Sequence, residues 1–342
     1  MQCILSIAAT LVAIFALATT TTAQQITGVY VGNQGNFSDQ NGSVTFYDTQ
    51  TLASLQILED FGTLVQSLIL HEGKAYIMSN TSHNVDIIDV ATNTRETPIM
   101  GIPSPRYMAV VDTDKAYVSN LYDATVTIVD LASRSVTGKV SVGSNPEDLA
   151  VVGHLAFVAN SGFGHNSTVT VIDLTADTVF ATVDTGCDGP RHLAVDHDGE
   201  VWVFCNGKTV YNDDFTLVLE RTNGAVVILD SSTGAIESTI LLDSQAGAAS
   251  AGQDVFYSAE SQEAFLVRGN DKLVLVFDTA NNRYKEIISL AGDGTVGAIA
   301  YDADADELYA ARLDADNPYT AAGTVTVHGR DGAVLRHTFL PA

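Results

Sequence analysis

The residues best suited to binding or acid–base chemistry follow a recurring proline. After Pro105, Pro146 and Pro190 the chain carries charged or polar side chains at two successive positions. Such a set could anchor a small ligand or a partner's loop, or could pair internally and hold ordered water. The residues are Gln66, Arg106, Tyr107, Glu147, Asp148, Arg191 and His192, to which weaker matches of the same pattern add Ser67, Gln253 and Asp254.

Internal repeats supply the elements that must position these side chains. The strand-like run V-x-V/I-h-D occurs in seven copies, as VTFYD, VDIID, VTIVD, VTVID, VVILD, VLVFD and, in degraded form, VTVHG, with spacings between 41 and 57 residues. A run of the form x-Y-V-x-N precedes most copies, and the proline run P-x-x-h-A-V precedes that run. With one further strand after each copy, a repeat holds four short strands separated by turn residues.

This arithmetic predicts an all-β fold, a seven-bladed β-propeller of four-stranded antiparallel blades in a single domain over residues 24–342. The first repeat shows no inner strand, so we expect 27 strands. In this connectivity the fourth strand of one blade leads to the first strand of the next at the mouth of the central channel. The positions after each proline are therefore predicted to meet there.

The repeat carries a family resemblance. The runs from Pro105 to Asp130 and from Pro146 to Asp173 resemble the YVTN-repeat β-propellers of surface-layer and periplasmic proteins. The opening stretch from Gly28 to Thr51 resembles secreted members of Bacteroidetes-like bacteria. The resemblance implies the propeller fold, but it implies no particular activity, because propellers host binding, scaffolding and catalysis alike.

The net charge of the chain and its first 23 residues indicate which partners it excludes and where in the cell it is found. The chain has 41 Asp and Glu residues against 16 Lys and Arg, a net charge of −25, which argues against nucleic acid as a partner. Residues 1–23 contain no charged side chain and an apolar run from Ile4 to Ala18, which predicts a signal peptide cleaved after Ala23. We expect a monomer in the periplasm, at the cell surface or outside the cell, without membrane insertion.

Aromatic residues lie in the segments expected to form loops on the same face as the channel mouth. They are Phe37, Tyr122, Phe163, Tyr211, Phe215 and Tyr319. Exposed aromatic rings are costly unless they pack together or meet a ligand. Both alternatives stay open, and the second would make this face a recognition surface for a glycan, a peptide or a protein.

The sequence predicts neither a metal site nor a bound cofactor. His83, His165 and His192 fall in different repeats without a known ligand spacing. Asp302, Asp304 and Asp306 begin like a calcium loop, but no glycine follows at the sixth position and Leu313 stands at the twelfth. We therefore interpret the aspartates as a polar hairpin turn.

Two cysteines remain in the expected mature chain. Cys187 precedes Pro190, and Cys205 ends a strand that is predicted to pair with the one beginning there. In an oxidising compartment they favour a disulfide, and the alternative is two unrelated buried thiols.

Three functional hypotheses remain. The first is a non-catalytic binding or scaffold protein that engages a partner or small ligand at the channel mouth. The second is a metal-assisted lactonase- or lyase-like enzyme that uses Glu147 and Asp148 with His192. The third is a partner subunit of a periplasmic redox enzyme, although no C-x-x-C-H motif is present. Neither a G-x-S-x-G elbow nor an H-E-x-x-H run occurs, which favours the first hypothesis.

Overall fold

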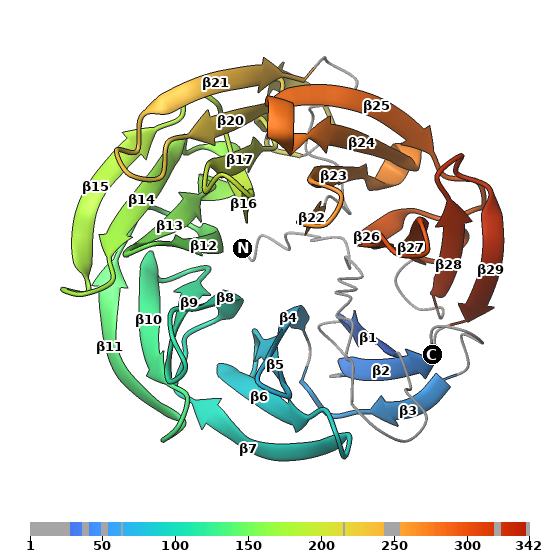
Figure 1. Cartoon of the computed structure of the whole chain (residues 1–342), viewed down its shortest axis with the longest axis horizontal. Helices are drawn as coiled ribbons and strands as arrows, with labels where there is room; N and C mark the ends of the chain where they lie inside the picture. The colour runs from blue at the N-terminus through green and yellow to red at the C-terminus, as the bar shows by residue number, and fades with distance from the viewer. Residues whose placement is uncertain are drawn as a thin grey trace.

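The computed structural model describes residues 28–35, 41–48, 54–62, 64–214, 216–242, 254–317 and 323–339. Its strands form small antiparallel sheets arranged radially around a central axis (Figure 1). The short 3-10 helices η1 (Gly162–Gly164), η2 (Gly269–Asp271) and η3 (Thr279–Asn281) lie between strands. Among the described residues no helix is long and apolar enough to cross a membrane.

Six of the sheets have four strands. The first two consist of β4 (Val65–His71), β5 (Lys74–Ser79), β6 (Asn84–Asp89) and β7 (Thr94–Met100), and of β8 (Pro105–Val110), β9 (Lys115–Asn120), β10 (Thr125–Asp130) and β11 (Ser135–Ser141). The next two consist of β12 (Pro146–Val152), β13 (Leu155–Asn160), β14 (Thr168–Asp173) and β15 (Thr178–Asp184), and of β16 (Pro190–Val195), β17 (Val201–Cys205), β20 (Ala225–Leu229) and β21 (Ile236–Leu241). The last two consist of β22 (Val255–Ser258), β23 (Glu263–Arg268), β24 (Leu273–Asp278) and β25 (Arg283–Ser289), and of β26 (Val296–Asp302), β27 (Glu307–Arg312), β28 (Thr324–Gly329) and β29 (Val334–Phe339).

The remaining radial sheet has three strands, β1 (Gly28–Asn33), β2 (Ser43–Asp48) and β3 (Ser54–Leu58). The prediction of seven four-stranded blades is therefore wrong, since six blades are complete. Within the described residues no strand pairs with the inner edge of β1, which agrees with the missing inner-strand pattern in the first repeat. A further two-stranded hairpin, β18 (Thr209–Tyr211) and β19 (Val218–Arg221), interrupts the fourth complete blade and was not predicted.

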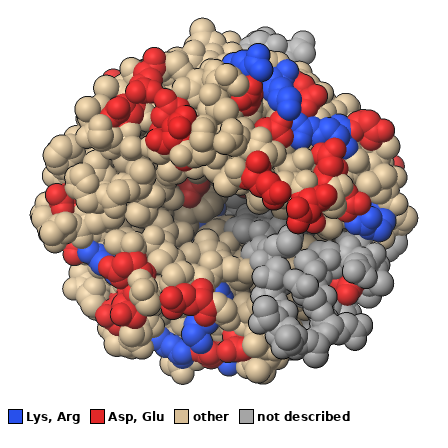
Figure 2. All heavy atoms as spheres, viewed as in Figure 1, with Lys and Arg blue, Asp and Glu red and all other residues tan. Residues whose placement is uncertain are grey.

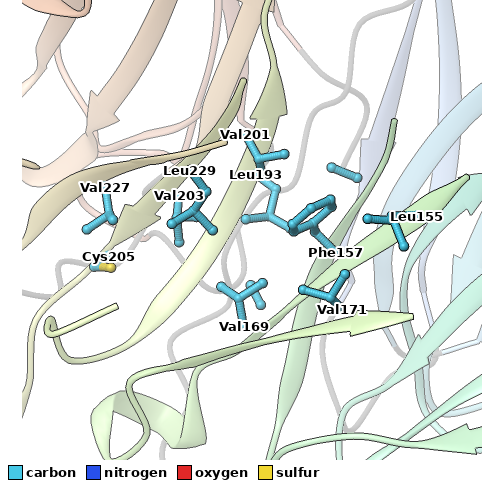
Figure 3. Packing of buried hydrophobic residues seen from close by; sticks show 12 residues of the cluster. Leu155, Phe157, Val169, Val171, Leu193, Val201, Val203, Cys205, Val227 and Leu229 are labelled. Carbon is cyan, nitrogen blue, oxygen red and sulfur yellow. The ribbon is translucent and has the colours of Figure 1, made fainter. Parts of the chain in front are cut away.

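Apolar clusters between neighbouring sheets hold the ring together. Seven such clusters each combine residues of two adjacent sheets. In the cluster of Figure 3, Phe157 of β13 packs beside Leu193 of β16 and Val203 of β17. Another cluster joins Val29 of β1 to Tyr309 of β27, so in the described part of the chain side-chain packing, without strand pairing, joins the last blade to the three-stranded sheet. Burial of each large apolar side chain stabilises the fold by about 1.5–3 kcal/mol.

The most regular repeat residues have structural roles. The side-chain amide of Asn120 donates to the hydroxyls of Thr125 and Thr127, both at 2.8 Å, and thus ties β9 to β10. At the end of β20, the carboxylate of Asp230 accepts hydrogen bonds from the following turn, including the Thr233 N–H at 2.7 Å. These bonds lower the pKa of Asp230 to about 2. The recurring Asn and Asp therefore mark strand ends rather than a ligand site.

Candidate channel-mouth site

Inner strands β4, β8, β12, β16, β22 and β26 lie nearest the axis, as predicted from the order of runs in each repeat (Figure 1). Several of these strands begin with a β-bulge directly after the position of the recurring proline. In β8, Pro105 pairs with Asn120 and Met108 with Val118, so Arg106 and Tyr107 share a single partner, Ser119. A bulge re-aims side chains, and the same irregularity follows Val65, Pro146, Pro190 and Val296.

An ion pair between neighbouring blades forms the centre of the site. Arg106 Nε donates to Glu147 Oε2 at 2.6 Å, and both side chains are largely buried, with 14% and 5% exposed. The Arg106 guanidinium also lies 5.5 Å from the centroid of the Tyr107 ring. Burial alone would raise the pKa of Glu147, but the charges of Arg106 and Arg191 hold that pKa below its usual value.

Two aspartates, Asp148 in β12 and Asp254 directly before β22, each link one blade to the following one. Asp148 Oδ2 accepts a hydrogen bond from the Leu193 N–H at 3.1 Å, and Asp254 Oδ2 accepts one from the Ile299 N–H at 3.2 Å. His192 lies on β16, the inner strand between β12 and β22. Its ring centroid is 5.8 Å from that of Tyr107, and its Nδ1 is 3.8 Å from Asp148 Oδ2. These contacts place residues from successive inner strands around one end of the channel.

Asp254 is the carboxyl group of this set whose pKa is raised. Burial raises its pKa to about 6, although the charges of His192 and Arg191 and the backbone hydrogen bonds act in the opposite direction. Between pH 4 and pH 6 the folded chain therefore keeps a proton that the unfolded chain releases. By linkage, the contribution of Asp254 to stability falls as the pH rises through this window.

We predict that Asp254→Asn stabilises the protein at neutral pH and not in acid. The gain in free energy of unfolding should grow from near zero at pH 4 to about 2 kcal/mol at pH 7.5, discounted because the side chain is partly accessible. Urea unfolding of wild type and variant across this range measures the difference. A gain that does not change with pH would contradict the raised pKa.

Three buried polar atoms of the site have no hydrogen-bond partner among the described residues. They are Gln66 Oε1, Arg191 Nε and His192 Nε2. Gln66 and His192 are each 3% exposed. Leaving a buried polar atom unpaired costs about 1–3 kcal/mol, so each of these atoms lowers the stability of the folded chain.

The structure thus brings most of the predicted channel-mouth residues close enough to influence one another electrostatically. They are Arg106, Tyr107, Glu147, Asp148, Arg191, His192 and Asp254. Gln66 lies on the adjacent inner strand β4, where its neighbour Ser67 donates to the backbone oxygen of Arg106 at 2.7 Å. Gln253 lies outside the described residues, as do Phe37, Phe215 and Tyr319.

Two of the predicted aromatic residues are neighbours at the rim. Tyr122 and Phe163 are 58% and 51% exposed, and their ring centroids are 6.1 Å apart. Tyr122 lies close enough to Arg106 to influence its pKa. The Phe163 backbone is left-handed, with φ 53° and ψ 39°, an unfavourable conformation for an aromatic residue and one that is common at functional sites.

The unpredicted hairpin β18–β19 carries the predicted Tyr211 and adds exposed leucines beside it. Tyr211 is 44% exposed, and Leu217 and Leu219 are 59% and 62% exposed. The run TLVLE contains three consecutive apolar residues, which could have indicated the second strand, but it does not alternate and stands outside the repeat pattern.

A disulfide fixes the base of this rim. Cys187 and Cys205 are bonded, with 6.3 Å between their Cα atoms. Beside them the backbone of Gly189 adopts φ 68°, and a Cβ atom there would lie 2.9 Å from the Gly207 oxygen. The loop before β16 therefore approaches the start of the hairpin closely.

The described residues contain no group of three or more His, Cys, Asp or Glu side chains able to hold a metal ion. His83 Nδ1 accepts a hydrogen bond from the Ser104 N–H at 3.0 Å, and the Asp302 turn is closed by a bond from the Ala305 N–H at 3.1 Å. Local hydrogen bonds therefore account for the position of the His83 ring and for the aspartate turn at Asp302.

A separate pocket of about 270 Å³ lies at the opposite end of the inner strands, near the turns after β22 and β26. It is lined by Phe256, Ser258, Glu260, Asp302 and Tyr309, among others.

Figure 2 shows one face of the disc, hollowed at its centre, with carboxylates distributed over several sectors around the hollow.

Three solved structures share this fold at low sequence identity. They are the hydrazine synthase of Kuenenia stuttgartiensis (19% identity, 76% of this chain and 74% of that chain, TM-score 0.58), the computationally designed Ika8 protein (14%, 96% and 89%, 0.59) and U3-55K (11%, 83% and 84%, 0.64). At these identities the likeness concerns the fold alone. No curated protein matches the chain.

A family model gives a more direct assignment. The model described as "Domain of unknown function (DUF5074)" matches residues 27–321, which includes nearly all the strands around the axis. The chain therefore belongs to the DUF5074 family, whose fold in this member is a β-propeller.

Proposed function

We propose that the protein is a non-catalytic binding propeller that engages a small polar ligand or the loop of a partner at the channel mouth. The observation that carries the proposal is the convergence of four residues from three inner strands on one end of the channel: Arg106 of β8, Glu147 of β12, and Arg191 and His192 of β16. The exposed Tyr122–Phe163 pair at the same rim supports it, because such rings are costly to leave in water.

Arg191 offers the sharpest test of this location. Arg106 is paired with Glu147, so its removal would strand a buried carboxylate, whereas no ion pair is found for Arg191 among the described residues. Arg191→Met should weaken binding at least tenfold for any compound or protein captured by immobilised wild-type chain. Arg283→Ala, which alters an arginine that is 66% exposed on the outer strand β25, is the matched control.

The binding assay should combine pull-down with thermal-shift screening of small molecules. If every interaction of the wild type persists unchanged in Arg191→Met, the binding site is elsewhere. The enzyme alternative has less support, because the described residues offer no set of metal ligands around Glu147, Asp148 and His192.

We further propose that the chain is exported after cleavage behind Ala23, so that residues 24–342 form the mature domain, and that its repeats are of the YVTN type. The Cys187–Cys205 disulfide supports an oxidising compartment. The intact mass of the exported protein would report both the cleavage point and the oxidation state. An uncleaved or fully reduced chain would contradict the proposal.

A further inference from the structure

The pocket at the far end of the inner strands lies beside the sheet that, in its described part, has no inner strand. The inner strand β26 contacts the inner strand β22 on one side, and on its other side it faces β1. Val29 of β1 therefore lines the pocket directly, together with Ala300 of β26 and Tyr309 of β27. These three side chains belong to one buried apolar cluster, which forms the floor of the pocket.

Aromatic rings supply most of the remaining apolar lining. Phe256 and Tyr257 come from β22 and Tyr301 comes from β26, and all three are partly exposed. The Tyr301 ring is held in place, since its centroid lies 4.7 Å from that of Phe265 and its hydroxyl donates to Asp306 Oδ1 at 2.7 Å. Fixed aromatic rings favour both apolar groups and cations as neighbours.

The charged residues that line the pocket are all acidic among those the structure describes. Glu260 follows β22, Asp302 ends β26, and Asp304 lies in the turn after it. In the described part of the chain, no Lys, Arg or His forms an ion pair with any of the three. Asp302 Oδ1 accepts one hydrogen bond, from the Ala305 N–H at 3.1 Å, and a carboxylate can accept several.

A neighbouring arginine does not neutralise this wall. The Arg330 guanidinium lies 5.6 Å from the centroid of the Tyr301 ring, but it is absent from the lining of the pocket. Its Nη2 donates to Glu263 Oε1 at 2.7 Å and to Glu286 Oε1 at 2.8 Å. Because two carboxylates already face Arg330, the negative charge of the pocket lining stays uncompensated.

The size of the pocket and the separation of its carboxylates indicate the kind of cation. The described residues contain no group of three acidic side chains able to hold one metal ion, so Glu260, Asp302 and Asp304 line the pocket at separate points. The volume of about 270 Å³ is near the lower end of the range for small-molecule sites, about 300–1,000 Å³. A molecule with one ring and one ammonium group fits both observations.

We propose that this pocket binds a small organic cation with an apolar body, such as an arylalkylammonium ion. The ring of the ligand packs on Phe256 and Tyr301, and its ammonium group faces the carboxylates of Glu260, Asp302 and Asp304. The net charge of −25 attracts such cations to the chain as a whole. The site lies apart from the channel mouth, so this inference goes beyond the proposed function and does not depend on it.

Three compounds that share a phenyl ring test the preference for positive charge. They are 2-phenylethylamine, which is cationic, 2-phenylethanol, which is neutral, and 3-phenylpropanoate, which is anionic. Titration calorimetry with the full mature chain at pH 7 should show that the amine binds at least tenfold more tightly than the alcohol and that the anion binds most weakly. Equal affinity for amine and alcohol, or no binding of the amine at about 10 mM, would overturn the inference.

A pair of charge variants tests the location. Glu260→Gln with Asp304→Asn alters two exposed side chains, so it should keep the Tm and the affinity for 2-phenylethanol while weakening amine binding at least tenfold. Glu59→Gln with Asp213→Asn removes two exposed carboxylates elsewhere and is the matched control. An equal loss in the control would show attraction to an acidic chain rather than a site, and the inference would fail.

Two further variants separate this site from the channel mouth. Phe256→Leu keeps an apolar side chain without a ring face and should weaken amine binding about threefold, whereas Arg191→Met should leave it unchanged. Amine binding that depends on Arg191 and not on Glu260 and Asp304 would overturn this inference and leave the proposed function standing. Displacement of the amine by Ca²⁺ that binds through the same carboxylates would also overturn it, because the pocket would then be a metal site.

Discussion

Replacing Glu147 with glutamine is expected to lower the free energy of unfolding by about 3–5 kcal/mol, a large fraction of the stability of a typical domain. The substitution removes the charge that Arg106 faces at 2.6 Å, in surroundings where both side chains are nearly excluded from water. The guanidinium then stays buried without its anion. Urea unfolding at pH 7 measures the loss.

Two comparisons show whether the loss comes from the unpaired charge. The double variant Arg106→Met with Glu147→Leu removes both charges and should recover most of the stability, because apolar residues of similar volume often replace a buried pair at little cost. Asp123→Asn breaks an exposed pair with Lys139, where the atoms are 3.6 Å apart, and should cost less than about 1 kcal/mol. A loss below 1 kcal/mol for Glu147→Gln would show that water reaches the pair.

Removing the disulfide by Cys187→Ala with Cys205→Ala is expected to cost about 3 kcal/mol. The bond closes a loop of 18 residues, and the entropy of the unfolded chain rises when that loop is released. Cys205 also packs in the cluster between β13 and β17, so part of the loss reflects its burial. Urea unfolding with and without reductant measures both contributions.

Wild type in reductant is the matched control for the cysteine variant, because it breaks the bond and keeps both side chains. It should lose most of the 3 kcal/mol, while the double variant should be insensitive to reductant. Alkylation of both thiols in native, unreduced wild type would refute the bond. Loss of stability without loss of ligand affinity would show that the rim holds its shape without it.

The ring arrangement could be predicted because the repeat is local. Each run such as VTIVD is short, rich in β-branched residues and buried along most of its length, and the recurring Asn and Asp bind neighbouring segments within one blade. The number of complete blades was overcounted, because β1 to β3 match three of the four runs of a blade. The pattern of these three runs does not reveal whether a distant segment of the chain supplies the fourth strand of that sheet.

The channel-mouth residues could be grouped from the sequence by one common offset from the recurring proline. Their pairing could not be predicted, since Arg106 and Glu147 lie on different sheets and meet through packing between blades. The raised pKa of Asp254 likewise depends on burial by neighbouring strands. The exposed hairpin β18–β19 was missed because a two-stranded ribbon has no buried face to impose an apolar pattern.

The sequence by itself determined which residues form the strands of the repeat, which strand of each complete blade lies innermost and where turns separate the strands, because these depend on neighbours within about ten positions. Only the tertiary structure decided which charges pair, which polar atoms stay unpaired and how the ring closes beside β1. Those features arise between sheets that are distant in the chain, where burial and distance set the energies and no local pattern records them.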